Sequence, residues 1–211
     1  MADLEHVLSE IDQPIPGDLK RCIDFHGHLC PGLLYGYLVA KGAMSLLDVH
    51  RSKDEEVVVI TENDTCAVDA IQVLLGSTAG KGNLIFKDYG KNVFTVLNRK
   101  TKRAVRFSRK EAYQYEGRHK EEFERLEAAY AAGLATDDQR ARQKRMKALD
   151  LMTKPFRAVF ETKEIPYPDP PYAQLAPSRA CTLCGEMTMA TKMVETTDDR
   201  ALCIPCSRRQ G

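Results

Sequence analysis

Two Cys-x-x-Cys pairs near the end of the chain restrict most strongly what this sequence can fold into. The pairs are Cys181 with Cys184 and Cys203 with Cys206, and eighteen residues separate them. Each pair forms a tight turn that presents two thiolates, and four thiolates complete a closed tetrahedral Zn²⁺ site. A segment of about 35 residues cannot bury a sufficient apolar core, so the metal must supply much of its folding free energy. The spacing therefore predicts a structural zinc site. The rival interpretation, in which each pair is a redox motif, is disfavoured because the surrounding sequence lacks a βαβ pattern.

A proline-rich stretch separates these cysteines from the rest of the chain. We expect residues 166–177 to form a stiff, extended linker, because prolines favour extended backbone. The predicted domains are an α+β core at 1–108, a charged helical arm with a returning strand at 109–165, and a small zinc-binding domain at 178–211. The prolines are Pro166, Pro168, Pro170, Pro171 and Pro177.

Composition excludes several classes of protein. Hydrophobic residues make up 43% of the chain and charged residues 29%, which is typical of a soluble globular protein. No apolar run approaches the roughly 20 residues that a membrane span requires, and residues 1–13 lack the pattern of a secretory signal. Seven cysteines, an odd number, fit metal binding in a reducing compartment better than a disulfide framework. We therefore expect a cytoplasmic protein that does not contact a membrane.

Two histidines and a cysteine alternate at residues 26, 28 and 30. If this segment is extended, His26, His28 and Cys30 point to one side and their donor atoms can converge. Pro31 favours the first turn of a helix, and apolar residues recur behind it at helical spacing. Cys30 is then near a helix N-terminus, where the helix dipole favours thiolate over thiol. The pattern predicts a functional site, because a cap or a packing residue would explain one of these side chains but not three.

Cys66 repeats this arrangement later in the chain. It follows the strand-like run at 57–60, which is β-branched throughout and predicts a strand buried on both faces. With Asp64 or Thr65 as N-cap, Cys66 lies in the first turn of the next helix and Asp69 shares its face. Two such helix starts that face each other would form one pocket.

Further strands and helices define an α+β fold with helices packed on a mainly antiparallel sheet. Residues 3–11 predict an amphipathic helix, and a second helix is expected with Asp18 as its cap and Cys22 in the core. Strands are expected at 55–61, 84–86, 93–97, 102–107 and 156–165, and charged helices in two pieces at 109–152, with Gly133 between them.

Two segments suggest ligands and are weighed against simpler interpretations. Residues 76–83 contain glycines and Lys81, but only three residues lie between Gly76 and the Gly80-Lys81 pair, whereas a P-loop has four. The segment is therefore not a P-loop, and Lys81 is at most an anion contact. The basic residues at 140–147 are typical of a solvated helix face rather than a nucleic-acid surface, since the net charge is only +1 and aromatic residues are scarce nearby. His119 is expected at the surface.

Residues 25–32, 66–72 and 76–84 together resemble the FmdE family, named after the E component of formylmethanofuran dehydrogenase. The resemblance covers about residues 18–108, and the two cysteine pairs resemble the zinc-finger tail of many members. It implies an α+β core, a metal site near the His-Cys motif and a homodimer. It does not imply the dehydrogenase reaction, because that chemistry uses a molybdenum or tungsten pterin carried by the other components of the enzyme.

Three hypotheses follow from these patterns. In the first, the chain is a redox or C1-metabolism accessory protein that binds a divalent metal: zinc, nickel or iron. The metal ligands are His26, His28, Cys30 and Cys66, and Asp69 orients one of them. The candidate catalytic residues are Cys30, Cys66 and His28. In the second, the chain is a non-catalytic module that binds a protein partner through its zinc finger or assembles a metal cofactor. The third, nucleic-acid binding, is disfavoured by the charge. Cys30 and Cys66 are also open to interpretation as a redox disulfide pair.

Overall fold

The structure, a computed structural model, describes residues 15–209 of the chain. The helix expected at 3–11 lies outside the described residues. The chain divides into two compact units, one up to Pro171 and the other from Tyr172 onward. Within the described residues, no helix is both long and apolar enough to cross a membrane.

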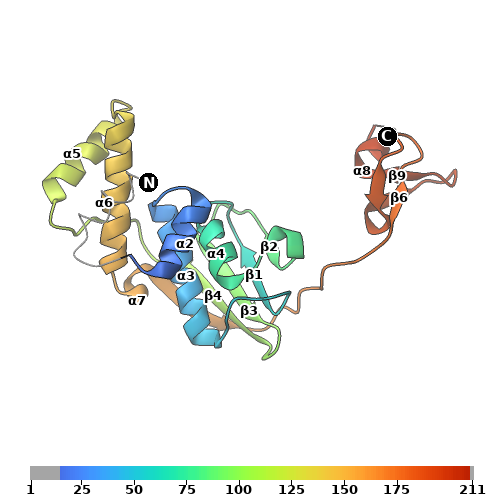
Figure 1. Cartoon of the computed structure of the whole chain (residues 1–211), viewed down its shortest axis with the longest axis horizontal. Helices are drawn as coiled ribbons and strands as arrows, with labels where there is room; N and C mark the ends of the chain where they lie inside the picture. The colour runs from blue at the N-terminus through green and yellow to red at the C-terminus, as the bar shows by residue number, and fades with distance from the viewer. Residues whose placement is uncertain (1–14, 210–211) are drawn as a thin grey trace. The chain divides into compact units, whose positions relative to one another are not determined.

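A five-stranded sheet forms the base of the larger unit (Figure 1). The strand order is β2-β1-β3-β4-β5; β1 and β2 are parallel, and every other pair is antiparallel. This confirms the predicted α+β fold with a mainly antiparallel sheet. The strands are β1 (Val57–Thr61), β2 (Leu84–Phe86), β3 (Val93–Asn98), β4 (Arg103–Arg109) and β5 (Phe160–Ile165). β1 lies inside the sheet, and its first three valines are buried, as the β-branched run predicts.

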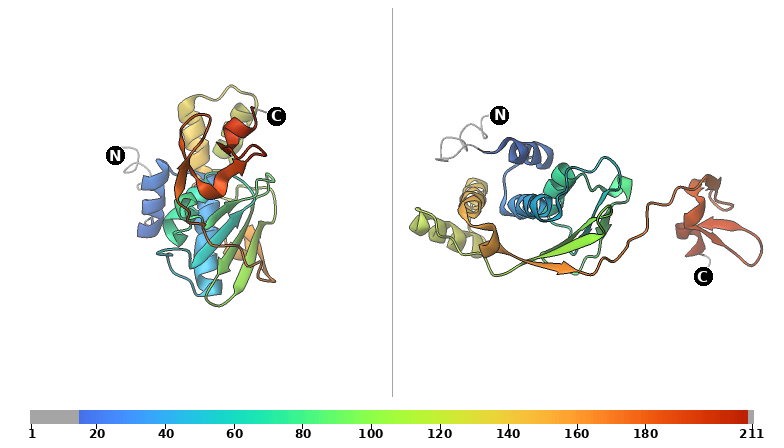
Figure 2. Two further views of the ribbon diagram at one scale, coloured as in Figure 1. Left: turned by 90° about the vertical axis from the view of Figure 1, so that its right-hand side faces the viewer. Right: turned by 90° about the horizontal axis from the view of Figure 1, so that it is seen from below.

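Three helices lie on one side of this sheet, and the first of them packs on the other two rather than on the strands (Figure 2, right). They are α2 (Gly17–His26), α3 (Pro31–Leu47) and α4 (Ala67–Leu75). α2 begins two residues earlier than expected, so Asp18 is in its first turn and Pro16 is its N-cap. Asp18 instead joins the helices, because its carboxylate accepts hydrogen bonds from Tyr37 (3.0 Å) and Lys41 (2.9 Å) of α3. Cys22 is fully buried, as predicted.

The charged segment after β4 belongs to the same unit. It contains α5 (Lys120–Ala131), α6 (Asp137–Thr153) and the short α7 (Phe156–Val159), so the strand expected from 156 begins only at Phe160. Thr136 and Gln139 form a capping box at the start of α6. Ala148 and Leu151 of α6 enter the apolar core, and β5 pairs with β4 at the edge of the sheet. The core therefore continues to residue 165.

The first part of the proline-rich stretch is attached to the larger unit. The buried Arg99 donates hydrogen bonds to the carbonyls of Pro170 (2.7 Å) and Pro171 (3.0 Å). Lys102 forms an ion pair with Asp169 at 2.7 Å, and its ammonium lies 4.7 Å from the centre of the Tyr167 ring. These contacts extend the larger unit to Pro171, so it includes the first six residues of the predicted linker.

Lys81 has a structural role that the sequence did not predict. It ends the 3₁₀ turn η1 (Ala79–Lys81), and its ammonium donates to the carbonyls of Ser52, Lys53 and Asp54 at 3.1, 3.4 and 2.9 Å. Three carbonyl acceptors satisfy its three donors. The interpretation of Lys81 as an anion contact is therefore wrong: it anchors the turn that precedes β1.

The smaller unit consists of two short hairpins and one turn of helix. Its elements are β6 (Ser178–Ala180), β7 (Met187–Met189), η2 (Ala190–Lys192), β8 (Met193–Glu195), β9 (Ala201–Cys203) and α8 (Ile204–Ser207). β6 pairs with β7 and β8 with β9, both antiparallel. Its buried core comprises Leu202 and three cysteines, with Met193 packed against them. So small a core gives little hydrophobic stabilisation.

Candidate metal centres

The His-Cys motif is a junction between two helices and not the extended segment that we expected. His26 is the last residue of α2, and Gly27 ends that helix in the left-handed conformation with φ of 94°. Cys30 is the N-cap of α3, and its Sγ accepts a hydrogen bond from the backbone N–H of Leu33 at 3.4 Å. The end of one helix and the start of the next, rather than strand alternation, bring His26 and Cys30 together.

The donor atoms of His26, His28 and Cys30 lie within 4.8 Å of one another. The Nε2 atom of His26 is 3.6 Å from the Sγ atom of Cys30, and the two imidazole rings are 4.6 Å apart between centres. His28 is exposed, His26 is partly exposed and Cys30 is buried. One nitrogen from each histidine and one sulfur can therefore converge on a single ion that is open to solvent on the side of His28.

Asp69 fixes the orientation of His26. Its Oδ2 atom lies 2.7 Å from Nδ1 of His26. Because a carboxylate only accepts hydrogen bonds, Nδ1 carries the proton and donates it. In the neutral ring the lone pair is then on Nε2, the nitrogen that faces Cys30. Gln72 lies one turn further along α4, and its side-chain amide donates to the other oxygen of Asp69 at 3.4 Å.

Cys66 is next to this group but is not one of the three converging residues. It occupies the N-cap position of α4, where Asp64 or Thr65 was expected. It lies beside Cys30, because a Cβ atom on Gly32 would be 3.5 Å from Sγ of Cys66 and 3.8 Å from Sγ of Cys30. Both helix starts therefore meet, as the sequence predicts.

Two glycines of α3 permit this approach, and sequence reasoning missed them. A Cβ atom on Gly36 would lie 2.0 Å from the carbonyl oxygen of Ala67, and one on Gly32 would lie 3.0 Å from Cβ of Cys66. The signal was present as two small residues four positions apart, on one face of the helix. At these positions the backbone of α3 packs directly against the start of α4.

Burial reverses the expected ionisation of Cys30 in the absence of metal. The pKa of its thiol is raised to about 11, chiefly because burial disfavours the charged form, and the neighbouring Cys66 adds to this effect. Hydrogen bonds from the N–H groups of Leu33 and Gly32 oppose the rise without cancelling it. The expectation that the helix start would make Cys30 a free thiolate is therefore wrong. The pKa of His28 is lowered by burial and by the charges of His26 and Lys144.

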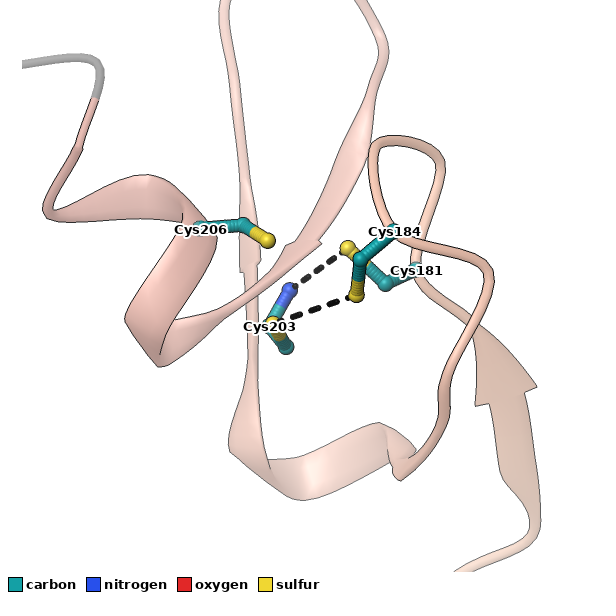
Figure 3. A group of neighbouring side chains, drawn as sticks. All are labelled: Cys181, Cys184, Cys203 and Cys206. Carbon is teal, nitrogen blue, oxygen red and sulfur yellow. Dashed lines mark hydrogen bonds between the residues drawn. The ribbon is translucent and has the colours of Figure 1, made fainter.

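The four C-terminal cysteines form a second cluster (Figure 3). All four sulfur atoms lie within 4.8 Å of one another; those of Cys184 and Cys203 are 3.9 Å apart. The N–H of Cys203 donates to Sγ of Cys181 at 3.3 Å. Backbone donors of this kind, from Cys184 and Cys203, lower the pKa of Cys181 to about 6. Four sulfurs in one small volume match the closed tetrahedral geometry of a Cys₄ site.

The fold and these sites define an α+β protein with two separate groups of side chains that could each hold a metal ion. The family model described as "FmdE, Molybdenum formylmethanofuran dehydrogenase operon" matches residues 25–161. The chain belongs to the FmdE family. The match extends well past residue 108, where the resemblance in the sequence ended, and reaches the start of β5.

Two further proteins are similar to this chain. A probable S-adenosyl-L-methionine-binding protein of Archaeoglobus fulgidus is 28% identical over 200 residues, which are 90% of this chain and 52% of the relative. The chain therefore spans about half the length of that protein. The crystal structure of a tungsten formylmethanofuran dehydrogenase FmdE-like protein from Syntrophus aciditrophicus superimposes with a TM-score of 0.54 at 20% identity, over 90% of this chain and 89% of the other. This likeness shows the shared fold.

Proposed function

We propose that this protein is a metal-binding accessory protein of redox or C1 metabolism. In this proposal His26, His28 and Cys30, with Cys66 as a fourth donor or a reactive neighbour, hold a divalent metal in the core. Zinc, nickel and iron all accept imidazole and thiolate ligands. The C-terminal cysteines Cys181, Cys184, Cys203 and Cys206 hold a structural Zn²⁺.

The observation that carries this proposal is the chain of contacts from Asp69 through His26 to Cys30. A carboxylate 2.7 Å from one nitrogen of a histidine directs the other nitrogen at a thiol 3.6 Å away. Histidine ligands of protein-bound metals typically donate their second N–H to a carboxylate or carbonyl, which fixes the tautomer and raises ligand basicity. A histidine that serves only as a helix cap does not require this arrangement.

The exposure of His28 favours a functional metal over a structural one. Three protein ligands with one open position are the pattern of catalytic sites, where a bound metal polarises a ligand or lowers the pKa of water. Asp69 orients His26, and the start of α3 positions Cys30. The thiol of Cys30 must lose its proton when it becomes a ligand, because metals bind thiolate.

The accessory role is supported by the family description, which refers to a formylmethanofuran dehydrogenase operon. We propose no pterin-dependent dehydrogenase reaction for this chain alone. We further propose a cytoplasmic homodimer, in which the charged segment at 109–152 contacts the second copy.

Metal analysis tests the central claim. We expect two metal ions per chain in the purified protein, and one in His28→Ala and in Cys184→Ser. Cys66→Ser should keep one ion if Cys66 is the fourth donor and two if it is a reactive neighbour. Thr65→Ser, which changes the neighbour of Cys66 without removing a donor atom, should retain both. A protein with a single metal per chain, unchanged in His28→Ala and Cys66→Ser, would sink the proposal.

Exposed apolar side chains on the smaller unit support the alternative of a partner-binding or cofactor-assembly module. Leu183 is 51% exposed and Met187 68% exposed, although this unit has very little apolar material to bury. In this alternative the cysteine cluster presents these side chains to a protein partner. The test compares the proteins that co-purify with wild type, with Leu183→Ser and with Met187→Ser. If both variants recover every partner as well as wild type does, the result counts against this alternative.

A further inference from the structure

Arg109 and Lys147 are two half-buried cations without an ion pair in the part of the chain that the structure describes. Arg109 ends β4, and its guanidinium carbon lies 4.8 Å from the centre of the Tyr35 ring. Its Nε atom donates to the backbone carbonyl of Glu111 at 3.0 Å. Lys147 lies on α6, with its ammonium 4.5 Å from the centre of the Tyr113 ring. Each cation thus rests on the face of a tyrosine.

The neighbouring carboxylates are engaged elsewhere. Asp150 accepts hydrogen bonds from the Tyr113 hydroxyl at 2.6 Å and from the Glu116 N–H at 3.1 Å, and it lies 3.6 Å from the ammonium of Lys154. Lys154 also pairs with Glu116. Glu127 is the carboxylate that acts most on Lys147, but its side chain is hydrogen-bonded by Gln143. Lys154 is therefore neutralised within the cluster, whereas Arg109 and Lys147 are not.

Such an arrangement is unfavourable in the free protein. Burial lowers the pKa of Lys147, and the nearby charge of Arg109 lowers it further, against the attraction of Glu127. Two like charges that lose hydration without a counter-ion reduce stability. Groups of this kind are concentrated where a ligand supplies the missing charge.

We propose that Arg109 and Lys147 form an oxyanion-binding subsite for a carboxylate or phosphate group of a small ligand. A guanidinium presents two parallel N–H donors that match an oxyanion, and an ammonium adds a point charge. The rings of Tyr35 and Tyr113 each lie against one of the two cations. α6, which carries Lys147, and β4, which carries Arg109, both belong to the packed core.

The position of this subsite suggests which molecules would use it. Tyr35 follows Cys30 by five residues on α3, a rise of about 7–8 Å along a helix. Lys144, one turn before Lys147 on α6, is close enough to His28 to lower its pKa. A small organic anion could therefore keep its charged group on Arg109 and Lys147 while another group reaches the core metal. This last step rests on the proposed metal centre, whereas the subsite itself does not.

Calorimetric titration of the full-length protein with inorganic phosphate and, separately, succinate tests the subsite at constant ionic strength set with chloride. We expect Lys147→Met and Arg109→Gln each to weaken binding at least ten-fold, about 1.4 kcal/mol. Lys110→Met is the matched control, because Lys110 is exposed and donates to the Arg157 carbonyl. Equal loss in Lys110→Met, or no loss in the other two, would overturn the proposal.

The same titration on His28→Ala separates the subsite from the metal centre. Binding that survives in His28→Ala and is lost in Lys147→Met assigns the anion to the subsite. Binding that is lost in His28→Ala and unchanged in Lys147→Met assigns it to the metal and overturns the subsite. Metal content, measured on the same samples, reports separately on the proposed function.

Thermal unfolding shows whether a variant loses anion binding because it is misfolded. Without added anion, Lys147→Met should melt at or above the wild-type temperature, because it removes a repulsion; a large decrease would overturn the proposal. Residues 1–14 carry Asp3, Glu5, Glu10 and Asp12, so the chain itself offers a competing anion. If phosphate binds only after these four residues are changed to amides, Arg109 and Lys147 bind the acidic side chains of residues 1–14 instead of a ligand. That result would also overturn the proposed subsite.

Discussion

The Nδ1 atom of His26 lies 2.7 Å from Oδ2 of Asp69, although 43 residues separate the two in the chain. The contact joins the end of α2 to the first turn of α4. It is therefore the tertiary link that converts a local His-Cys motif into an oriented ligand set, and it leads to the first prediction.

Asp69→Asn should weaken metal binding at the core site about 10- to 100-fold, the usual cost of removing a carboxylate that supports a histidine ligand. The amide keeps the size of the side chain but loses the charge. Competition with a coloured chelator measures the affinity. Asp64→Asn, on the exposed loop before α4, is the control and should bind as wild type does. Equal affinities for all three proteins would contradict the assigned role of Asp69.

Gly36→Ala should destabilise the larger unit by at least about 1–3 kcal/mol, because its Cβ would lie 2.0 Å from the backbone oxygen of Ala67. Backbone cannot move aside as a flexible side chain can, so α4 must shift and take Cys66 with it. Gly17→Ala is the matched control, since nothing lies within 4 Å of a Cβ there. Urea denaturation measures both. A Gly36→Ala protein as stable as Gly17→Ala would show that the helices do not pack this closely.

The two metal sites should empty in a fixed order. Imidazoles must be deprotonated to bind metal, so the core site should release its ion first under mild chelation or as the pH falls below about 6. Emptying it should leave the larger unit folded, because its apolar core does not depend on metal. Emptying the cysteine cluster should unfold the smaller unit, whose core is largely the cysteines themselves. Metal counting and limited proteolysis follow both events, and the reverse order would refute this division.

Mild oxidation of metal-free protein should join Cys30 to Cys66, because the sulfur atoms of both residues lie beside Gly32, where the two helix starts meet. With a small-molecule disulfide as oxidant, the bond between the two sulfurs of the reagent breaks as the bond between Cys30 and Cys66 forms, and the two thiol protons leave with the reagent as two small-molecule thiols. Peptide mapping identifies the linked pair. Bound metal should protect both residues, and the buried Cys22 should remain reduced throughout. A product that contains Cys22 would contradict the geometry of the two helix starts.

Glu56 should contribute stability that disappears in acid. Ser52 and the N–H of Asp54 donate to its carboxylate and lower its pKa from 4.5 to about 2. A lowered pKa stabilises the folded state above pH 4.5, and the contribution is lost as the pH falls from 4.5 through 2. Glu56→Gln should thus be less stable than wild type at pH 7 and equal to it below pH 2, by urea denaturation. Glu121→Gln, on the exposed side of α5, should show no such difference.

The sequence by itself determined the features that depend on local chemistry. The β-branched run at 57–60, the break at Gly133 and the Cys-x-x-Cys spacing need only neighbouring residues to express their preference. For the same reason most strands and helices of the described residues were predicted, although the strand expected from 156 begins with the helix α7. Helical spacing likewise predicted that Asp69 shares a face with Cys66.

Only the tertiary structure decided what depends on distant segments. Burial under packed helices outweighs the helix dipole at Cys30, so the free thiol stays protonated, and a local pattern cannot show how deeply a residue is buried. The three carbonyls that hold Lys81 come from residues nearly thirty positions earlier in the chain. Likewise, β5 joins the sheet beside β4 only because the chain returns after α6. Such contacts are fixed by the packing of the whole core, which no single stretch of the sequence encodes.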